Sequence, residues 1–180
     1  LAGTRPIVTY VLMGITVLVF GLQSLSSGWL GYDLPLLLGA KFNAAIAKGE
    51  IWRLFTAAFL HGSVLHLFFN MYALYVIGRR LERFYGHLNF LLLYFVSAFA
   101  GNVLSFVLSP NPQIPSLGAS TAIFGLFAAE GIFIIQNRKL FGSNQTRQMI
   151  SNLAIVLLIN LAYGFTATNI DNMGHIGGLL

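Results

Sequence analysis

Charged side chains are scarce in this sequence of 180 residues, which is 8% charged and 57% hydrophobic. About a quarter of the residues of an ordinary soluble domain are charged, so a soluble protein of this composition would lack the polar groups to cover its surface. Runs without any Asp, Glu, Lys or Arg extend over residues 6–32, 84–129 and 148–170. Because a membrane-spanning helix needs about 20 mostly apolar residues, these runs predict a protein that crosses the bilayer several times.

Cysteine is absent, which excludes disulfide bonds and thiolate metal sites. The formal net charge is +5, and in a soluble protein an excess of this sign would suggest nucleic acid as a partner. Here the basic residues stand at the ends of apolar segments, where membrane topology explains them, and we predict no nucleic-acid partner. The first apolar segment has one preceding Arg and no clear cleavage site, so we interpret it as a retained helix.

The apolar segments predict an all-α, polytopic bundle of six transmembrane helices that forms a single domain over residues 1–180. The segments cover residues 6–26, 54–77, 87–108, 118–136, 149–166 and a stretch that begins near 173. The last stretch provides about 12 Å of helix before Leu180, less than half of a hydrocarbon core of about 30 Å. We therefore interpret the sixth helix as truncated in this chain.

Residues 27–53 mix aromatic side chains with glycine and proline, which predicts a structured segment at the membrane interface rather than a disordered loop. The basic residues favour a cytoplasmic N-terminus, since that side then receives seven of them and the other side three. The seven are Arg5, Arg79, Arg80, Arg83, Arg138, Lys139 and Arg147, and the three are Lys41, Lys48 and Arg53. The same orientation places the loops 109–117 and 167–172 on the outer side.

Polar residues inside apolar segments indicate function, because their burial against lipid is costly. Ser120, in Gly-Ala-Ser-Thr at 118–121, begins the fourth segment, and His175, in Gly-His-Ile-Gly-Gly at 174–178, begins the sixth. Both therefore lie at a similar shallow depth in the membrane. A hydroxyl is activated as a nucleophile by a base, and imidazole is the usual base. The glycines beside His175 allow a neighbouring helix to approach closely. Taken singly, Ser120 also suits a helix cap or an interhelical hydrogen bond, and His175 a packing role.

His66 and Asn70 are four residues apart in the second segment and so share one helix face. With the backbone N–H of Ser120 they offer donors of the kind that stabilise an oxyanion in acyl transfer. The alternative is a zinc site made by His61, His66 and His175. A zinc site would leave Ser120 unexplained, so we expect neither metal nor cofactor.

In this order and on these segments, the motifs resemble those of the rhomboid intramembrane serine proteases, over essentially the whole chain. The residues that carry the resemblance are Trp52-Arg53, His61, His-Leu-Phe-Phe-Asn at 66–70, Gly78-x-x-x-Glu82-x-x-x-Gly86, Gly118-Ala119-Ser120 and the glycine-rich motif around His175. The sequence departs from the family pattern at Thr121, where glycine is common, and at Phe124, where tyrosine is common.

The resemblance implies a catalytic dyad of Ser120 and His175 that works through an acyl-enzyme without a carboxylate. It implies that His66, Asn70 and the Ser120 amide line an oxyanion hole, that Gly118 shapes the site and that Phe124 packs against His175. Supporting roles then fall to His61, Trp52 and Arg53. The implied substrates are transmembrane proteins of the surrounding bilayer, cut near the outer end of their helix. We expect a multi-pass protein of the bacterial inner membrane whose active site opens to the outer side.

Two other functions fit the composition. A catalytically inactive or weak rhomboid-like protein would bind membrane clients without cutting them, but such proteins usually lack the serine or the histidine, and both are present. A small transporter or channel would be expected to have paired intramembrane charges or inverted repeats. Glu130 is the candidate charge inside an apolar segment, and it suits a hydrogen bond within the bundle as well.

Overall fold

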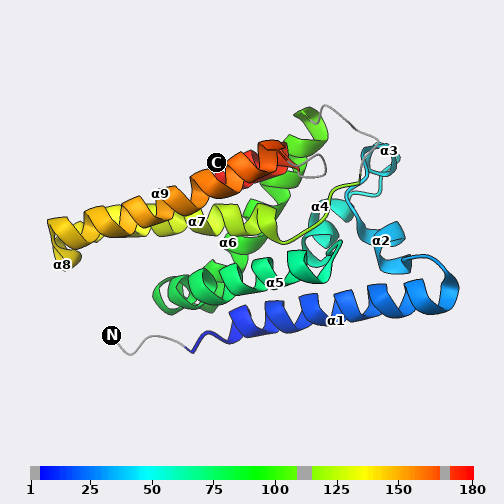
Figure 1. Cartoon of the computed structure of the whole chain (residues 1–180), viewed down its shortest axis with the longest axis horizontal. Coiled ribbons are helices and arrows are strands. Elements are labelled where there is room, and N and C mark those ends of the chain that lie inside the picture. The colour runs from blue at the N-terminus through cyan, green and yellow to red at the C-terminus, as the bar shows by residue number, and fades with distance from the viewer. Residues whose placement is uncertain (1–4, 109–114, 167–170) are drawn as a thin grey trace.

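The computed structural model describes residues 5–108, 115–166 and 171–180, and the side chains of all of these except 159–166. Helices make up nearly all of the regular structure in these ranges. The other regular feature described is an isolated antiparallel bridge between Lys41 and Ser116. Figure 1 shows the helices along the chain. The all-α prediction is confirmed for the described part of the chain.

The helices follow one another in a simple order. They are α1 (Ile7–Leu30), α2 (Leu34–Gly39), α3 (Asn43–Ile46), α4 (Arg53–Thr56), the 3-10 helix η1 (Ala57–Phe59), α5 (Val64–Ala73), the π-helical turn η2 (Leu74–Gly78), α6 (Arg79–Leu108), α7 (Ser120–Gln136), α8 (Arg138–Phe141), α9 (Ser143–Thr166) and α10 (Asn172–Leu179).

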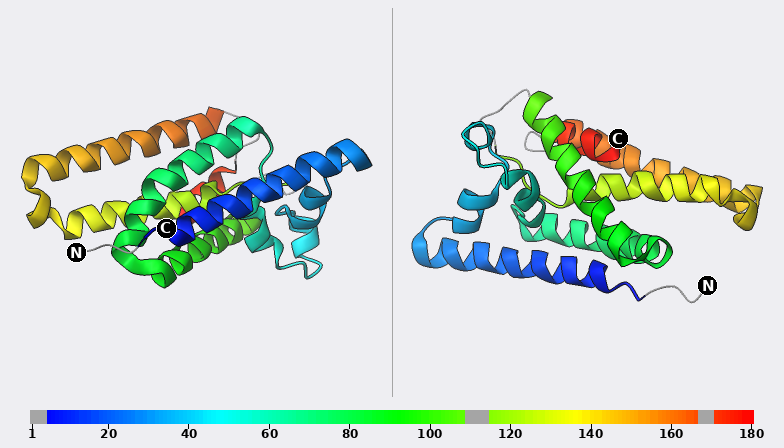
Figure 2. Two further views of the ribbon diagram at one scale, coloured as in Figure 1. Left: turned by 90° about the horizontal axis from the view of Figure 1, so that it is seen from below. Right: turned by 180° about the vertical axis from the view of Figure 1, so that it is seen from behind.

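Two helical stretches in the described ranges are long and apolar enough to cross a membrane, α1 and the 45 residues of Val64–Leu108. The second stretch changes direction at Gly86, whose φ of 78° and ψ of 170° break the helix and leave α5 and the body of α6 as separate arms (Figures 1 and 2). Helix α7 is apolar but shorter, with 17 residues. The chain is an integral membrane protein, and the count of six spanning helices stays a prediction.

The predicted second segment, 54–77, is not one helix. It contains α4 and η1, then a non-helical stretch at residues 60–63, and only then α5. Ser63 ends the interruption because its side chain accepts a hydrogen bond of 3.1 Å from the backbone N–H of His66, which caps the new helix. His61 therefore lies just before the helix and not on it, contrary to the prediction. Residues 79–83, which lie between the second and third predicted segments, are helical and open α6.

Residues 27–53 form a structured segment that includes α2 and α3, as their aromatic content predicted. Arg53 ties the segment together because its guanidinium donates to the carbonyl oxygens of Ala40 and Leu37, each at 2.9 Å, and to the Glu50 carboxylate at 2.7 Å. Trp52 is half exposed and donates from its indole nitrogen to Leu38 O at 3.2 Å. Both residues of the Trp-Arg motif thus hold the segment in place.

Buried carboxylates fasten the bundle at the end opposite this segment. Glu82 is fully buried and accepts hydrogen bonds from the N–H of Val8, the N–H of Thr9 and the hydroxyl of Thr9 at 2.8, 2.8 and 2.6 Å. It therefore satisfies donors that the first turn of α1 would otherwise leave free. Glu130 of α7 forms an ion pair with Arg80 of α6, so this intramembrane charge joins two helices.

Helix α10 packs against α6, α7 and α9, on the face of the bundle seen from behind in Figure 2. Helices α6 and α10 approach closely because glycines lie at their contact. A Cβ on Gly101 of α6 would lie 2.5 Å from the carbonyl oxygen of Gly174, and one on Gly177 would lie 2.7 Å from Cβ of Leu104. Larger side chains at these positions would push α10 away from α6.

Candidate active site

Ser120 is the first residue of α7 and follows a backbone turn built on Gly118. Gly118 has a φ of 124°, a conformation that residues with a Cβ rarely adopt. Its N–H donates to the carbonyl oxygen of Ala57 at 2.9 Å, which anchors the turn to the end of α4. The turn therefore presents Ser120 at the start of a helix, where the N–H groups of the first turn have no partner within that helix.

The neighbouring side chains also leave no room for a side chain at Gly118. A Cβ at this position would lie 2.8 Å from Cε1 and Nε2 of His66, and 3.6 Å from Nδ2 of Asn70. The imidazole of His66 and the amide of Asn70 consequently converge on the backbone two residues before Ser120. The structure thus brings together the two predicted donors and the predicted site-shaping glycine.

His175 approaches Ser120 from α10. Its Nε2 lies 2.9 Å from Oγ of Ser120, a hydrogen-bond distance between residues 55 positions apart in the sequence. His175 is buried, with 8% of its surface exposed. When Nε2 accepts a hydrogen bond from the hydroxyl, the neutral ring carries its own hydrogen on Nδ1. This is the arrangement in which imidazole acts as a base toward a serine.

Phe124 supports the imidazole from one helical turn along α7. Its ring stacks on His175 with centroids 4.4 Å apart and 8° between the planes. The stack restricts rotation of the imidazole about its side-chain bonds. The Nδ1 atom of His175 has no hydrogen-bond partner among the described side chains, so in that part of the chain no carboxylate orients the ring as in a Ser-His-Asp triad.

His61 orients Asn70 rather than the serine. Its Nε2 lies 3.0 Å from Nδ2 of Asn70, and its ring lies edge-on to that of His66 with centroids 4.9 Å apart. The backbone of His61 is held by Gln23 of α1, which accepts from the His61 N–H at 3.0 Å and donates to its carbonyl oxygen at 3.2 Å. Sequence reasoning missed Gln23, although a glutamine within the first apolar segment was the signal that could have identified it.

Thr121 takes the position where the family often has glycine. It is buried, and its side chain lies close to Gly101 of α6 and Gly174 of α10. A Cβ on Gly174 would lie 2.9 Å from Cγ2 of Thr121, and one on Gly101 would lie 3.1 Å from Cβ of Thr121. The methyl group therefore fills the space that the glycines of α6 and α10 leave.

Two acid–base groups near the start of α10, Asp171 and Lys41, were not predicted to take part. Burial by itself would raise the pKa of the Asp171 carboxyl, but hydrogen bonds from Ser105, Ser116 and the Gly174 N–H and the charge of Lys41 outweigh it and lower the pKa. Burial lowers the pKa of the Lys41 ammonium, against the opposing effect of Asp171. From the sequence, Lys41 was counted only as a charge of the outer side.

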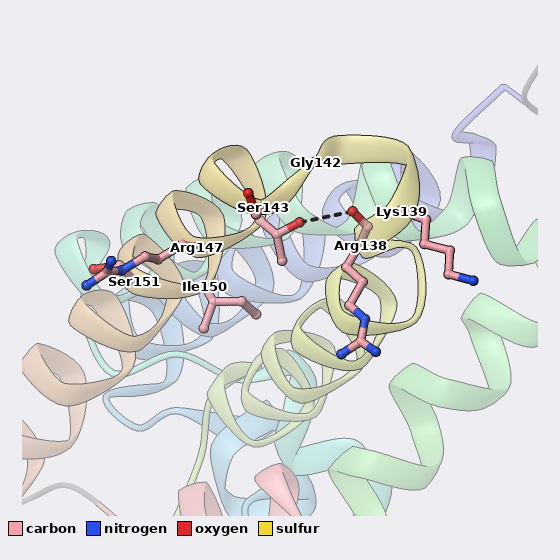
Figure 3. Close-up of a pocket in the computed structure, with 8 residues that line it drawn as sticks. Arg138, Lys139, Gly142, Ser143, Arg147, Ile150 and Ser151 are labelled. Carbon is pink, nitrogen blue, oxygen red and sulfur yellow. Dashed lines mark hydrogen bonds between the residues drawn. The ribbon is translucent and has the colours of Figure 1, made fainter.

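Other possible sites have less support. No three His, Cys, Asp or Glu side chains in the described ranges come close enough together to hold a metal ion. The open hollow in Figure 3 lies at the turn between α8 and α9, at the far end of α7 from Ser120. Its lining includes Arg138, Lys139 and Arg147 but no residue of the Ser120–His175 pair.

Comparison with known proteins identifies the same family as the sequence motifs. The family model described as the rhomboid domain matches residues 48–180. Rhomboid protease GluP of Bacillus subtilis is 42% identical over 176 residues, which are 98% of this chain and 33% of that protein. Putative rhomboid protease YdcA of the same organism is 33% identical, covering 97% of this chain and 83% of its own length.

The similarity extends to eukaryotes. RHOMBOID-like protein 5 of Arabidopsis thaliana is 37% identical over 153 residues, which are 84% of this chain and 48% of that protein. The chain thus spans a third to a half of the length of GluP and the Arabidopsis protein, and most of the length of YdcA.

Proposed function

This chain belongs to the rhomboid family, and on that premise we propose that it is an intramembrane serine endopeptidase with Ser120 as nucleophile and His175 as general base. The observation that carries the proposal is the 2.9 Å separation of Ser120 Oγ and His175 Nε2. A partly buried hydroxyl against an imidazole from another helix is the arrangement that activates a serine nucleophile. The relatives named proteases, GluP and YdcA, support the same reaction.

The reaction follows from the pair. Nε2 of His175 takes the proton of Ser120 Oγ as the oxygen attacks the carbonyl carbon of the substrate. The tetrahedral intermediate collapses when His175 returns this proton to the leaving nitrogen, which leaves an acyl group on Ser120. Water then attacks the acyl carbon while His175 takes its proton. His175 passes this proton to Ser120 Oγ as the acyl–oxygen bond breaks, which releases the carboxylic acid product and restores the serine. Nε2 of His175 thus carries the proton that is taken from each nucleophile, first Ser120 and then water.

The oxyanion of the intermediate needs hydrogen-bond donors. We assign them to the side chains of His66 and Asn70 and to the N–H of Ser120, because both side chains converge on Gly118 next to the nucleophile. The bond between Asn70 and His61 gives the amide a fixed orientation. Loss of one oxyanion donor reduces turnover about 10²- to 10³-fold in a serine protease.

The substrates that fit this site are transmembrane proteins of the same bilayer, which must unwind locally because a helical peptide bond is shielded from attack. Ser120 begins α7, and the basic residues 138 and 139 lie beyond its other end. With the N-terminus in the cytoplasm, the site opens to the outer side of a bacterial inner membrane. We propose that residues 1–180 belong to a single rhomboid-type domain.

The proposal is tested by cleavage of a model transmembrane substrate in liposomes. We expect Ser120→Ala and His175→Ala each to abolish cleavage while the melting temperature stays near that of the parent. The matched control is Ser143→Ala, which alters an exposed serine at the start of α9 and should cleave at the parent rate. A fluorophosphonate probe should label the parent but not Ser120→Ala.

Cleavage by Ser120→Ala at the parent rate would end the protease proposal. If the parent instead binds the substrate without cutting it, the chain is a client-binding rhomboid-like protein. The orientation has its own test, since the chain lacks cysteine. In intact cells an impermeant maleimide should label Lys48→Cys but not Ser143→Cys, and the reverse pattern would invert the topology.

A further inference from the structure

Lys41 is a buried cation in the outer segment between α2 and α3. Only 2% of its surface is exposed. Its Nζ donates to Oγ of Ser105 on α6 at 2.5 Å and lies 3.8 Å from a carboxylate oxygen of Asp171. A buried ammonium is strongly unfavourable unless it is paired and hydrogen-bonded, so this position selects a specific set of partners.

Asp171 connects this cation to the helix of His175. One carboxylate oxygen accepts the hydroxyl hydrogen of Ser105, and the other accepts the N–H of Gly174 at 2.8 Å, which caps α10. The carbonyl oxygen of Asp171 accepts the N–H of His175 itself at 3.1 Å. The carboxylate that pairs with Lys41 is therefore the group that fixes the first turn of α10.

The backbone of Lys41 reaches the other half of the site. Its N–H donates to the carbonyl oxygen of Ser116 at 3.0 Å, and the N–H of Ser116 donates back at 2.9 Å. Ser116 stands two residues before Gly118, in the segment that leads to the nucleophile. Lys41 thus holds the segment before Ser120 through its main chain and the helix of His175 through its side chain.

We propose that Lys41 is a positioning residue that, through Ser105 and Asp171, sets the placement of His175 against Ser120. This inference rests on the proposed protease function. Residues 167–170, which precede α10, lie outside the described part of the chain. In the described part, the polar contacts at Asp171 link the first turn of α10 to the segment that contains Lys41. A displacement of about 1 Å in a catalytic pair can reduce the rate about 100-fold.

The test compares Lys41→Met with Lys48→Met in the full chain, using a model transmembrane substrate. Both variants remove one positive charge from the same segment, but Lys48 is exposed. We expect Lys41→Met to lower kcat about 10- to 100-fold with KM within about twofold of the parent. Lys48→Met should leave both constants unchanged. A fluorophosphonate should label Ser120 correspondingly more slowly in Lys41→Met.

A double variant separates positioning from folding. Lys41→Met alone leaves the partly buried Asp171 without its cation, whereas Lys41→Met/Asp171→Asn removes both charges and keeps an asparagine that can cap α10. We expect the double variant to recover the parent melting temperature but not the parent kcat. A role of Lys41 in stability alone predicts that kcat recovers together with the melting temperature.

The outcomes are distinct from those for the protease itself. If Ser120→Ala abolishes cleavage but folded Lys41→Met keeps kcat within twofold of the parent, the positioning role is wrong and the protease proposal stands. Recovery of kcat in the double variant overturns the positioning role as well. If neither Lys41 variant folds, the lysine serves the fold and not the site, and the inference is rejected.

Discussion

The imidazole of His175 lies flat against the ring of Phe124, with centroids 4.4 Å apart and an angle of 8° between the planes. Phe124 stands one helical turn after Ser120, so the nucleophile and the support of its base come from one helix. A stacked aromatic pair contributes about 0.5–1.5 kcal/mol beyond the area it buries. This contact takes the place in which a carboxylate orients the histidine of a soluble serine protease.

The stack predicts the effect of truncating Phe124. Phe124→Leu keeps an apolar side chain but removes the flat surface, so the imidazole gains rotational freedom and kcat should fall about tenfold for a loss near 1.4 kcal/mol. Phe124→Tyr keeps the ring and should retain at least half of the parent rate in the substrate-cleavage assay. Equal rates for the leucine variant and the parent would show that the stack does not orient the base.

Gly118 provides a second prediction. In Gly118→Ala the new methyl group would lie 2.8 Å from the His66 ring at a φ of 124°, so His66 and the turn must move apart. We expect kcat to fall by about 10²-fold or more, as for the loss of an oxyanion donor. Gly142→Ala is the matched control, because Gly142 also has a positive φ, of 73°, but its Cβ would meet no atom within 4 Å.

Both glycine variants should lose a little stability from backbone strain, but only Gly118→Ala should lose activity. Cleavage rates and melting temperatures of the two proteins, measured side by side in one detergent, make the comparison. Full activity of Gly118→Ala would remove His66 from the proposed oxyanion hole.

Glu82 predicts an effect on stability rather than on chemistry. Glu82→Gln weakens charge-assisted hydrogen bonds to the first turn of α1, each worth about 1.5–3 kcal/mol. We expect a clear fall in the melting temperature, with the cleavage rate of the remaining folded protein unchanged. Glu50→Gln is the control, because it breaks a partly exposed pair with Arg53 that is worth at most about 1 kcal/mol.

The lowered pKa of Asp171 predicts how stability depends on pH. A carboxyl group whose pKa is lower in the folded state than in the unfolded chain contributes stability that is complete above the unfolded pKa, about 3.9. This contribution is lost as the pH falls below that value and through the folded pKa. The melting-temperature difference between the parent and Asp171→Asn should therefore be constant from pH 7 to 5 and shrink below pH 4. A constant difference down to pH 3 would contradict the assignment.

The helices were predictable where local composition decides them. The first segment, predicted at 6–26, is α1 at Ile7–Leu30, and the fourth, predicted at 118–136, is α7 at Ser120–Gln136. The second segment was predicted incorrectly because residues 60–63, Leu-His-Gly-Ser, are a short interruption between apolar stretches, yet Ser63 caps a new helix there. Hydropathy averages over many residues, whereas the start of a helix depends on a single side chain.

The sequence by itself determined the class of the protein, because a chain with so little charge can fold only where lipid covers its surface. It also determined the chemical groups available, since a hydroxyl, an imidazole and flanking glycines are properties of residues. The tertiary structure decided which of them meet: His175 with Ser120, Asn70 with His61, and Lys41 with Asp171. Contacts between residues 55 or more positions apart, such as the first, depend on how whole helices pack, and no local pattern encodes that geometry.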